Sequence, residues 1–306
     1  MKSVLILAAA ATVTFGGIVG VDARPHNRAP RPIVIIFMEN HSATSIIGNP
    51  SAPYENAFAA QGIRFTNYQE PPGGGPSLPD YLQLVAGSGC GKTSDSVIPG
   101  DPSISAAGCT TTLWNQLEAA GISWAVYEEG MPGACASNVT YDDRATGGPY
   151  ALKHNPATPF PAIWSHRELC QAHVLPFSVF DPSALPAVSF VAPNICNDQH
   201  GSSDHRWSSC MAGSSALLAR GDAWLAAHVP AMRAAGATIF LTYDESGTLF
   251  AAEVGHHIRP GLDATPMSHY SVLAGIEKLY HLPLLLNAAT ANPISFSRGG
   301  RDQATA

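Results

Sequence analysis

The sequence predicts an α/β fold in which a mostly parallel sheet is sandwiched by helices. Three nearly continuous apolar runs, at residues 31–38, 187–192 and 237–243, are typical of strands buried on both faces. Segments with apolar residues at helical spacing lie between these runs. Alternation of strands and helices is the pattern of a parallel sheet covered on both sides.

The remaining elements can be placed in order along the chain. Strands are expected at residues 31–38, 63–68, 122–127, 187–192, 237–243 and 248–257. Helices are expected at residues 52–61, 112–120, 222–235 and 268–280, and one more begins at Ser77. This order puts loops directly after the apolar strands, where ligand-binding groups gather in open α/β sheets.

The N-terminal residues have the pattern of a signal peptide. Lys2 is followed by an apolar run over residues 4–19 and by small side chains before Arg24, so cleavage is expected after Ala23. A membrane anchor is the alternative, although the run is short and contains glycine. The leader would occupy residues 1–23, and residues 24–306 would form a single exported domain. No other stretch is long and apolar enough to span a bilayer.

Charge and cysteine content narrow the class of protein. A formal net charge of −7 gives no indication of nucleic-acid binding. Six cysteines in an exported chain favour disulfides, for which 15 pairings are possible. The short spacings favour Cys90–Cys109, Cys135–Cys170 and Cys196–Cys210. The region 128–175 is rich in glycine and proline and is expected to be a lid or an insertion stapled by disulfides.

One loop combines glycines with a serine at the start of a helix. Residues 73–76 are three glycines and a proline, which cannot continue a helix or a central strand. Ser77 is expected to cap the helix that follows, with Asp80 completing a capping box. A helix N-terminus attracts phosphate, and the glycines leave room for a ligand to approach the backbone. Ser77 could therefore be a nucleophile; the alternative is that it only caps the helix.

Three of the apolar strands lead into acidic or amide side chains. Glu39 and Asn40 follow the first strand, Asp198 lies after the second, and Asp244 and Glu245 follow the third. If these strand ends share one edge of the sheet, oxygen ligands converge near Ser77. Such a set suits metal-assisted phosphoryl transfer, in which a divalent ion favours ionisation of the serine hydroxyl. Histidines could bind the phosphate oxygens or protonate the leaving group.

These residues occur within longer stretches that resemble one known family. The chain is similar to the bacterial secreted phosphoesterases, which include small acid phosphatases and larger phospholipases C and belong to the alkaline-phosphatase-like superfamily. The matching stretches run in family order from about residue 33 to residue 283 and include APYENAFAAQG (52–62), PSLPDYLQLVAG (76–87), KHNP (153–156), SFVAPNICNDQH (189–200), LTYDES (241–246) and SHYSVLAGIEKLYHLP (268–283).

The resemblance implies roles for individual residues. It implies a metal site made of Glu39, Asn40, Asp244 and Glu245, with Ser77 as a further ligand and the nucleophile, and Asp198 as ligand or orienter. It implies a phosphate site lined by His154, His200 and His269, with Lys153 as an additional contact. Two-metal members of the superfamily have a histidine where this chain has Glu245, and Asp-x-x-x-His where it has Asp198-Gln199-His200. These departures predict one divalent ion, for which Mg, Ca or Mn is expected.

The resulting hypothesis is a secreted, metal-dependent phosphomonoesterase of the acid phosphatase type that acts through a phosphoserine intermediate. Its substrate would be a small phosphorylated molecule or a phospholipid headgroup. The chain is short for a phosphodiesterase of the phospholipase C type, which is the first alternative. A secreted binding protein without enzymatic activity is the second alternative. It is disfavoured by the intact set of Glu39, Asn40, Ser77, Asp244 and Glu245.

Overall fold

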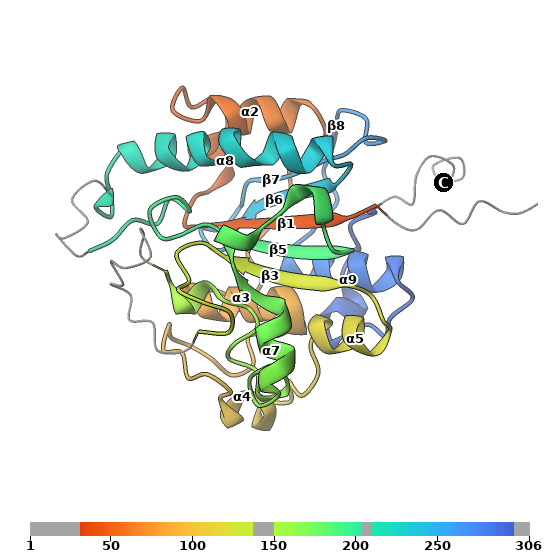
Figure 1. Ribbon diagram of the computed structural model, residues 1–306. Helices are drawn as coiled ribbons and strands as arrows, with labels where there is room; N and C mark the ends of the chain where they lie inside the picture. Colours follow the sequence, from red (N-terminus) through yellow and green to blue (C-terminus); the bar gives the residue numbers. More distant parts are fainter. Residues whose placement is uncertain (1–30, 137–149, 204–209, 297–306) are drawn as a thin grey trace, which may run out of the picture.

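The computed structural model describes residues 31–136, 150–203 and 210–296. The expected leader at residues 1–23 lies outside the described residues. No helix in the described part of the chain is long and apolar enough to cross a membrane. The two faces of a central sheet are covered by helices (Figure 1), as the sequence predicts.

The sheet has eight strands in the order β4-β3-β5-β1-β6-β7-β2-β8. All strands run in the same direction except β7, which is antiparallel to both β6 and β2. The strands are β1 (Ile33–Met38), β2 (Ile63–Phe65), β3 (Trp124–Glu128), β4 (Val174–Pro176), β5 (Val188–Ala192), β6 (Thr238–Tyr243), β7 (Ala251–Val254) and β8 (Gly261–Asp263).

Two layers of helices bury the sheet (Figure 1). Helices α2 (Pro53–Ala60) and α8 (Ala216–Ala234) cover one face, and α3 (Ser77–Ala86), α5 (Leu113–Ala119), α7 (Arg167–His173) and α9 (His269–Leu279) lie on the other. Shorter elements connect them: α1 (Ala43–Ile46), α4 (Pro102–Ala106), α6 (Pro161–Trp164), η2 (Leu152–His154), η3 (Phe177–Val179), η4 (Pro182–Ala184) and η6 (Leu286–Thr290).

The central strands are buried along their whole length. Every residue of β1, β3, β5 and β6 is buried, which explains why these segments are nearly continuous apolar runs. All residues of α3 are buried as well, so this helix lies in the core. The position of Ser77 is therefore fixed by packing on every side of the helix that it begins.

The strand register determines where the polar loops meet. In the parallel pair of β1 and β6, Met38 lies opposite Tyr243, so the next residues, Glu39 and Asp244, leave the sheet side by side. Strand β5 lies on the other side of β1, and its continuing loop leads to Asp198. The predicted convergence at one sheet edge therefore follows directly from the register.

The structure corrects the expected start of α3. Pro76, not Ser77, is the N-cap residue, and its side chain makes no capping hydrogen bond. Ser77 is the first helical residue, and its hydroxyl is directed to another partner. Asp80 does not complete a capping box, because its Oδ2 accepts a hydrogen bond from Gly75 N at 2.8 Å. The prediction of a serine cap was wrong, and the position of the helix was right.

Other boundaries differ in detail. The predicted strand at 63–68 ends at Phe65, the strand at 248–257 shortens to Ala251–Val254, and α8 begins six residues before the predicted start at residue 222. The short strands β4 and β8 were not predicted. The described residues at the end of the region 128–175 lead into β4, which is parallel to β3. The three predicted disulfides are confirmed: Cys90–Cys109, Cys135–Cys170 and Cys196–Cys210.

Candidate active site

Ser77 lies between a carboxylate and an ammonium group. Its Oγ donates a hydrogen bond to Glu39 Oε2 at 3.0 Å, and Lys153 Nζ donates to the same Oγ at 3.1 Å. Ser77 and Glu39 are fully buried, whereas the Lys153 side chain keeps 12% of its surface exposed. A hydroxyl whose hydrogen points to a carboxylate and whose oxygen faces a cation is placed to act as a nucleophile.

The acidic side chains come from the ends of neighbouring parallel strands. Glu39 follows β1, and its backbone N–H donates to the carbonyl of Asp198 at 2.9 Å. Asp244 follows β6, and its backbone N–H donates to the carbonyl of Met38 at 3.1 Å. Asn40 N donates to Asp244 Oδ1 at 2.8 Å. These contacts bring together four of the predicted metal ligands, Glu39, Asn40, Asp198 and Asp244.

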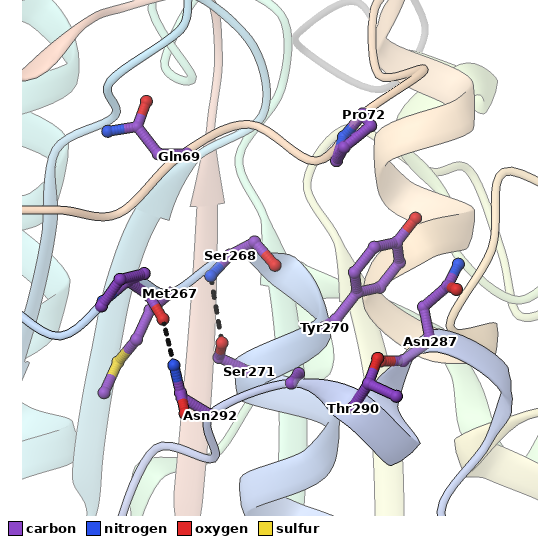
Figure 2. Close-up of a pocket in the computed structure, with 11 residues that line it drawn as sticks. Gln69, Pro72, Met267, Ser268, Tyr270, Ser271, Asn287, Thr290 and Asn292 are labelled. Carbon is purple, nitrogen blue, oxygen red and sulfur yellow. Dashed lines mark hydrogen bonds between the residues drawn. The ribbon is translucent and has the colours of Figure 1, made fainter.

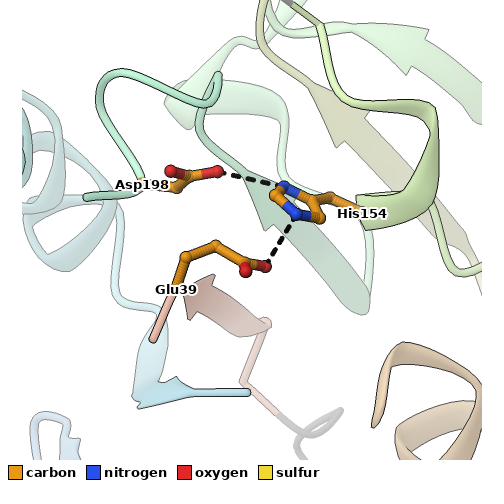
Figure 3. Close-up of side chains that lie close together, drawn as sticks. All are labelled: Glu39, His154 and Asp198. Carbon is orange, nitrogen blue, oxygen red and sulfur yellow. Dashed lines mark ion pairs between the residues drawn. The ribbon is translucent and has the colours of Figure 1, made fainter. Parts of the chain in front are cut away.

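His154 lies between two of these carboxylates (Figure 3). Its Nε2 is 3.1 Å from Glu39 Oε1, and its Nδ1 is 3.0 Å from Asp198 Oδ2. The ring is buried and stacks on Tyr81 with centroids 5.1 Å apart. A neutral imidazole has a single N–H, so it can donate to only one of the two carboxylates. The other contact requires an additional proton or a cation.

The electrostatics of this cluster favour a bound cation. Burial, followed by the charges of Asp244 and Asp198, raises the pKa of Glu39 well above its ordinary value. Burial also raises the pKa of Asp198 and lowers that of His154, whose protonation the Lys153 charge disfavours further. Adjacent buried carboxylates cannot all ionise unless a positive charge compensates them. A divalent ion would supply that charge.

The donor set fits a divalent ion. Asn40 Oδ1 and Asp244 Oδ2 are buried and have no hydrogen-bond partner in the described structure. Ligand atoms of Glu39, His154 and Asp198 all lie within 4.8 Å of one another. Carboxylate and amide oxygens with one imidazole suit hard or borderline divalent metals. The structure therefore contains a possible metal site, and it adds His154 to the residues that could bind the ion.

Lys153 connects Ser77 to a second group of polar residues. Its Nζ donates to Asp95 Oδ2 at 2.9 Å and contacts His200 Nε2 at 3.2 Å. His200 Nδ1 must donate to the carbonyl of Gly201, 2.7 Å away, so Nε2 carries a lone pair that accepts from Lys153. The His200 backbone N–H donates to Asp198 Oδ1 at 2.8 Å. Lys153 thus contacts Ser77 directly, and His200 lies next to Lys153.

The glycines before Ser77 have a different role from the predicted one. A Cβ atom on Gly75, whose φ is +55°, would lie 2.7 Å from Glu245 Oε2. A Cβ atom on Gly74 would lie 2.4 Å from Asp80 Oδ1. The glycines therefore make room for carboxylates of the chain itself. Glu245 is half-buried, and burial and the Asp244 charge raise its pKa to about 7.

His269 does not line the cluster around Ser77. Its Nε2 donates to the backbone carbonyl of Asp244 at 2.8 Å, and its Nδ1 accepts from Tyr68 Oη at 3.0 Å. The ring is fully buried, which lowers its pKa to about 4. Both ring nitrogens already make hydrogen bonds. His269 therefore stabilises the backbone at Asp244 and offers no free nitrogen to a phosphate.

Two residues of the site were not identified from the sequence. Asp95 accepts hydrogen bonds from Lys153 and from the backbone N–H of Leu78, but it lies in an irregular loop without a motif. Tyr81 lies within α3 and donates to Glu39 Oε1. Its spacing of four residues from Ser77 puts both side chains on the same face of α3, and this signal was available in the sequence.

A separate cavity of about 440 Å³ lies next to α9 (Figure 2). Gln69 and Pro72 from the segment before Ser77 form part of its wall, and the side chains of Ser268, Tyr270 and Asn287 surround it. The described lining consists of neutral side chains and includes none of the predicted catalytic or metal-binding residues. The cavity is therefore distinct from the Ser77 cluster.

Comparison with solved structures identifies the class of fold. An alkaline phosphatase superfamily protein from Vibrio parahaemolyticus superposes with a TM-score of 0.53 at 10% sequence identity, covering 85% of this chain and 70% of that protein. The likeness shows that the two proteins share a fold.

Comparison of sequences identifies the family. The Phosphoesterase family profile matches residues 59–254. A phosphatidylinositol-3-phosphatase from Mycobacterium tuberculosis is 32% identical over 277 residues, which cover 86% of this chain and 81% of that protein. A probable acid phosphatase from Kluyveromyces lactis is 28% identical, covering 82% of this chain and 58% of the yeast protein. The chain belongs to the Phosphoesterase family and is a hydrolase of phosphoric esters.

Proposed function

We propose that this chain is an exported, metal-dependent phosphomonoesterase in which Ser77 attacks the phosphorus atom. The observation that carries the proposal is the position of Ser77 Oγ, which donates to Glu39 and accepts from Lys153. In the first step Oγ passes its proton to the Glu39 carboxylate as the Oγ–P bond forms, the ester P–O bond breaks, and the leaving alcohol takes up a proton. Water then cleaves the phosphoserine, releases phosphate and restores the hydroxyl.

The residues at the strand ends would hold one divalent ion. Glu39, Asn40, Asp244 and Glu245 are the proposed ligands, with Ser77 and Asp198 as further donors. When bound, the ion supplies positive charge that favours ionisation of the serine and neutralises charge on the phosphate. The two unpaired buried oxygens, on Asn40 and Asp244, support this assignment.

The phosphate would lie on the Lys153 side of Ser77. Lys153 contributes a cation that already contacts Oγ, and His200 presents a ring nitrogen next to it. Incoming phosphate oxygens would take over hydrogen bonds that Lys153 now makes with Ser77 and His200. For His200 to bind a phosphate oxygen or to protonate the leaving group, its Nε2 must first take up a proton, because that nitrogen carries a lone pair in the structure. We assign His154 to holding Glu39 and Asp198 in place.

The substrate is proposed to be a phosphate monoester. The curated relatives with matching sequences carry the names of phosphatases, and the mycobacterial relative is named for a phosphatidylinositol 3-phosphate. A phosphoinositide headgroup is therefore the first lipid substrate to test beside soluble monoesters. Three disulfides and the N-terminal pattern favour export to an oxidising compartment.

The test is hydrolysis of a chromogenic phosphate monoester by the purified protein. We expect activity that is lost with a chelator, restored by Mg, Ca or Mn, and reduced at least about 10³-fold in Ser77→Ala, because the nucleophile is gone. Ser183→Ala is the matched control, since Ser183 is an exposed serine on η4. Acid quenching with a phosphorus-labelled substrate should leave the label on the Ser77 peptide.

Three outcomes would contradict the proposal. Full activity of Ser77→Ala would exclude Ser77 as nucleophile, and activity unaffected by chelation would exclude the metal. Hydrolysis of a phosphocholine diester without hydrolysis of any monoester, phosphatidylinositol 3-phosphate included, would move the assignment to a phospholipase C-type diesterase.

A further inference from the structure

Three buried side chains form a closed ring of hydrogen bonds beneath the site. Tyr243 Oη contacts Glu55 Oε1 in a short hydrogen bond and lies 2.8 Å from Gln199 Oε1. Gln199 Nε2 closes the ring to Glu55 Oε2 at 3.2 Å. Each of the three residues is at most 2% exposed. Such a ring is stable in the interior only if every contact contains a hydrogen.

Counting hydrogens shows that Glu55 must carry a proton. The tyrosine hydroxyl has one hydrogen, which serves only one of its two contacts. The glutamine amide supplies a hydrogen to the contact that its NH₂ group faces, whichever way the amide is turned. These two hydrogens leave one of the three contacts without a hydrogen, and Glu55 is the only member of the ring that can take up a third. A carboxylic acid proton on Glu55 completes the ring in both orientations.

The surroundings of Glu55 agree with this count. Burial raises the pKa of Glu55 to about 8. Lys and Arg side chains make no ion pair with Glu55 among the described residues. Asp222 accepts hydrogen bonds from the backbone N–H groups of Tyr54 and Glu55, which fixes the first turn of α2.

Each member of the ring is tied to a different part of the site. Tyr243 is the last residue of β6 and directly precedes Asp244. Gln199 lies between Asp198 and His200 in the sequence. Its φ is +81°, a backbone conformation that residues other than glycine rarely adopt unless their surroundings support it. Glu55 comes from α2. The ring therefore joins the two loops that carry the proposed ligands.

Helix α8 leaves space for this arrangement. Gly221 lies in the middle of α8, and a Cβ atom there would be 2.3 Å from Gln199 Cγ and 2.8 Å from the carbonyl of Asn197. Glycine is unfavourable inside a helix, so its presence here marks a close approach. Gln199 is thus held from two sides, by the ring and by the packing against α8.

We propose that Glu55, as a neutral carboxylic acid, is a positioning residue that fixes Asp198, His200 and Asp244 relative to one another. It acts through Tyr243 and Gln199 and touches neither substrate nor metal. The part of this inference that concerns catalysis rests on the proposed function of the Ser77 site. The inference that Glu55 carries a proton does not depend on that proposed function.

The kinetic test compares two substitutions of Glu55. In Glu55→Gln the amide can replace the acid, because its Nε2 donates to Tyr243 and its Oε1 accepts from Gln199. We expect Glu55→Gln to keep kcat within about threefold, and Glu55→Ala to lower it roughly 10- to 100-fold, as loss of outer-shell support does elsewhere. The effect should fall on kcat more than on KM, since Lys153 still binds the phosphate.

Controls separate positioning from general destabilisation. Glu253 on β7 is another fully buried acid, and its Oε1 has no partner in the described structure. Glu253→Ala should therefore leave kcat unchanged even if it lowers the melting temperature. If Glu55→Ala does not fold, Gln199→Met opens the ring while keeping a side chain of similar length. We expect Gln199→Met to show the same loss of kcat.

An infrared measurement tests the proton without any activity assay. A protonated carboxylic acid has a carbonyl band that an ionised carboxylate lacks. The difference spectrum of the wild type minus Glu55→Gln at pH 6 should contain that band. Absence of the band, or equal loss of kcat in Glu55→Gln and Glu55→Ala, would overturn the inference. A band in a protein that hydrolyses no phosphate ester would contradict only the proposed function.

Discussion

Lys153 links the proposed nucleophile, Ser77, to the polar residues His200 and Asp95. Its ammonium group contacts the proposed nucleophile, the acceptor nitrogen of His200 and the Asp95 carboxylate at the same time. The neighbouring carboxylates of Glu39 and Asp95 raise its pKa, against the effect of burial, which by itself lowers it. Lys153 is therefore charged at neutral pH and can hold an anionic substrate next to Ser77.

Replacing Lys153 should affect both binding and catalysis. Lys153→Met removes the cation while keeping the length of the chain, so kcat/KM for a monoester is expected to fall roughly 10²- to 10³-fold. Lys153→Arg should retain part of the activity, because the charge remains but the fork of donors fits the single Oγ poorly. Steady-state kinetics of both variants provide the measurement.

Lys92 offers the matched control for this prediction. It forms an ion pair with Asp101 at 2.7 Å, and neither residue contacts Ser77, Glu39 or His200 in the described structure. Lys92→Met should leave kcat/KM within about twofold. An equal loss in Lys92→Met and Lys153→Met would mean that charge removal acts through folding and not through the site.

Sequence reasoning identified the residues whose position depends on regular structure. Glu39, Asp198 and Asp244 follow buried parallel strands, and the common edge of such strands is a general property of the fold. Asp95 could not be found in this way, since an irregular loop brings it to Lys153. His269 was placed by resemblance at the phosphate, but the sequence does not show which way a side chain on α9 points.

At the scale of elements, the loop before α3 is fixed by the chain's own carboxylates. Glu70 Oε2 accepts hydrogen bonds from the backbone N–H groups of Ser246 and Gly247, immediately after the Asp244–Glu245 pair. Asp80 accepts from Gly75 N, and Glu245 lies against Gly75. The loops before α3 and after β6 are therefore held together, which sets the distance between Ser77 and the proposed ligands.

Alanine at Gly75 should disturb this junction. The new Cβ atom would lie 2.7 Å from Glu245 Oε2, so Glu245 would have to move away. We expect Gly75→Ala to weaken binding of the activating ion about tenfold or more, because Glu245 is a proposed ligand. Titration of activity with the metal, and calorimetry of metal binding, measure the change.

Gly73 separates the clash from backbone strain. Its φ is +75°, comparable to the +55° of Gly75, but a Cβ atom there would meet nothing within 4 Å. Alanine at either position adds roughly 1 to 2 kcal/mol of strain, and only Gly75→Ala adds the contact with Glu245. Equal metal affinity in the two variants would show that the close approach to Glu245 has no effect on the site.

The elements themselves were predictable where the periodic signal is long. The strands β1, β5 and β6 and the helix α9 follow from apolar runs or from helical spacing. The strands β4 and β8 have three residues each, too few for a pattern, and they form by pairing with the edges of β3 and β2. The cysteines paired with their neighbours in the sequence, as the short spacings predicted.

For the molecule as a whole, burial of acids dominates the dependence on pH. Burial raises the pKa of Glu55, Asp80, Glu253 and Glu277 to about 8 each. The folded state therefore keeps protons that the unfolded chain loses near its ordinary carboxyl pKa. Because the folded state binds more protons between these values, the free energy of unfolding decreases as pH rises through that interval.

Buried histidines have the opposite effect on the free energy of unfolding at lower pH. Burial lowers the pKa of His154, His200 and His269, so below about pH 6.5 the unfolded chain binds more protons at these residues. Their contribution to stability increases as pH rises to about 6.5 and then stays constant. Between pH 6.5 and 8, therefore, the buried acids alone determine how the free energy of unfolding changes with pH.

We therefore expect the metal-free protein to be less stable at pH 8 than at pH 6.5. For Glu253, whose pKa is raised by burial alone, the loss over this interval should be about 1 to 2 kcal/mol. Urea unfolding in chelator at the two pH values measures it. Glu253→Gln cannot ionise, so its midpoint should shift less between the two pH values than that of the wild type. A wild type that is equally stable at both would show that these acids are already ionised in the folded protein.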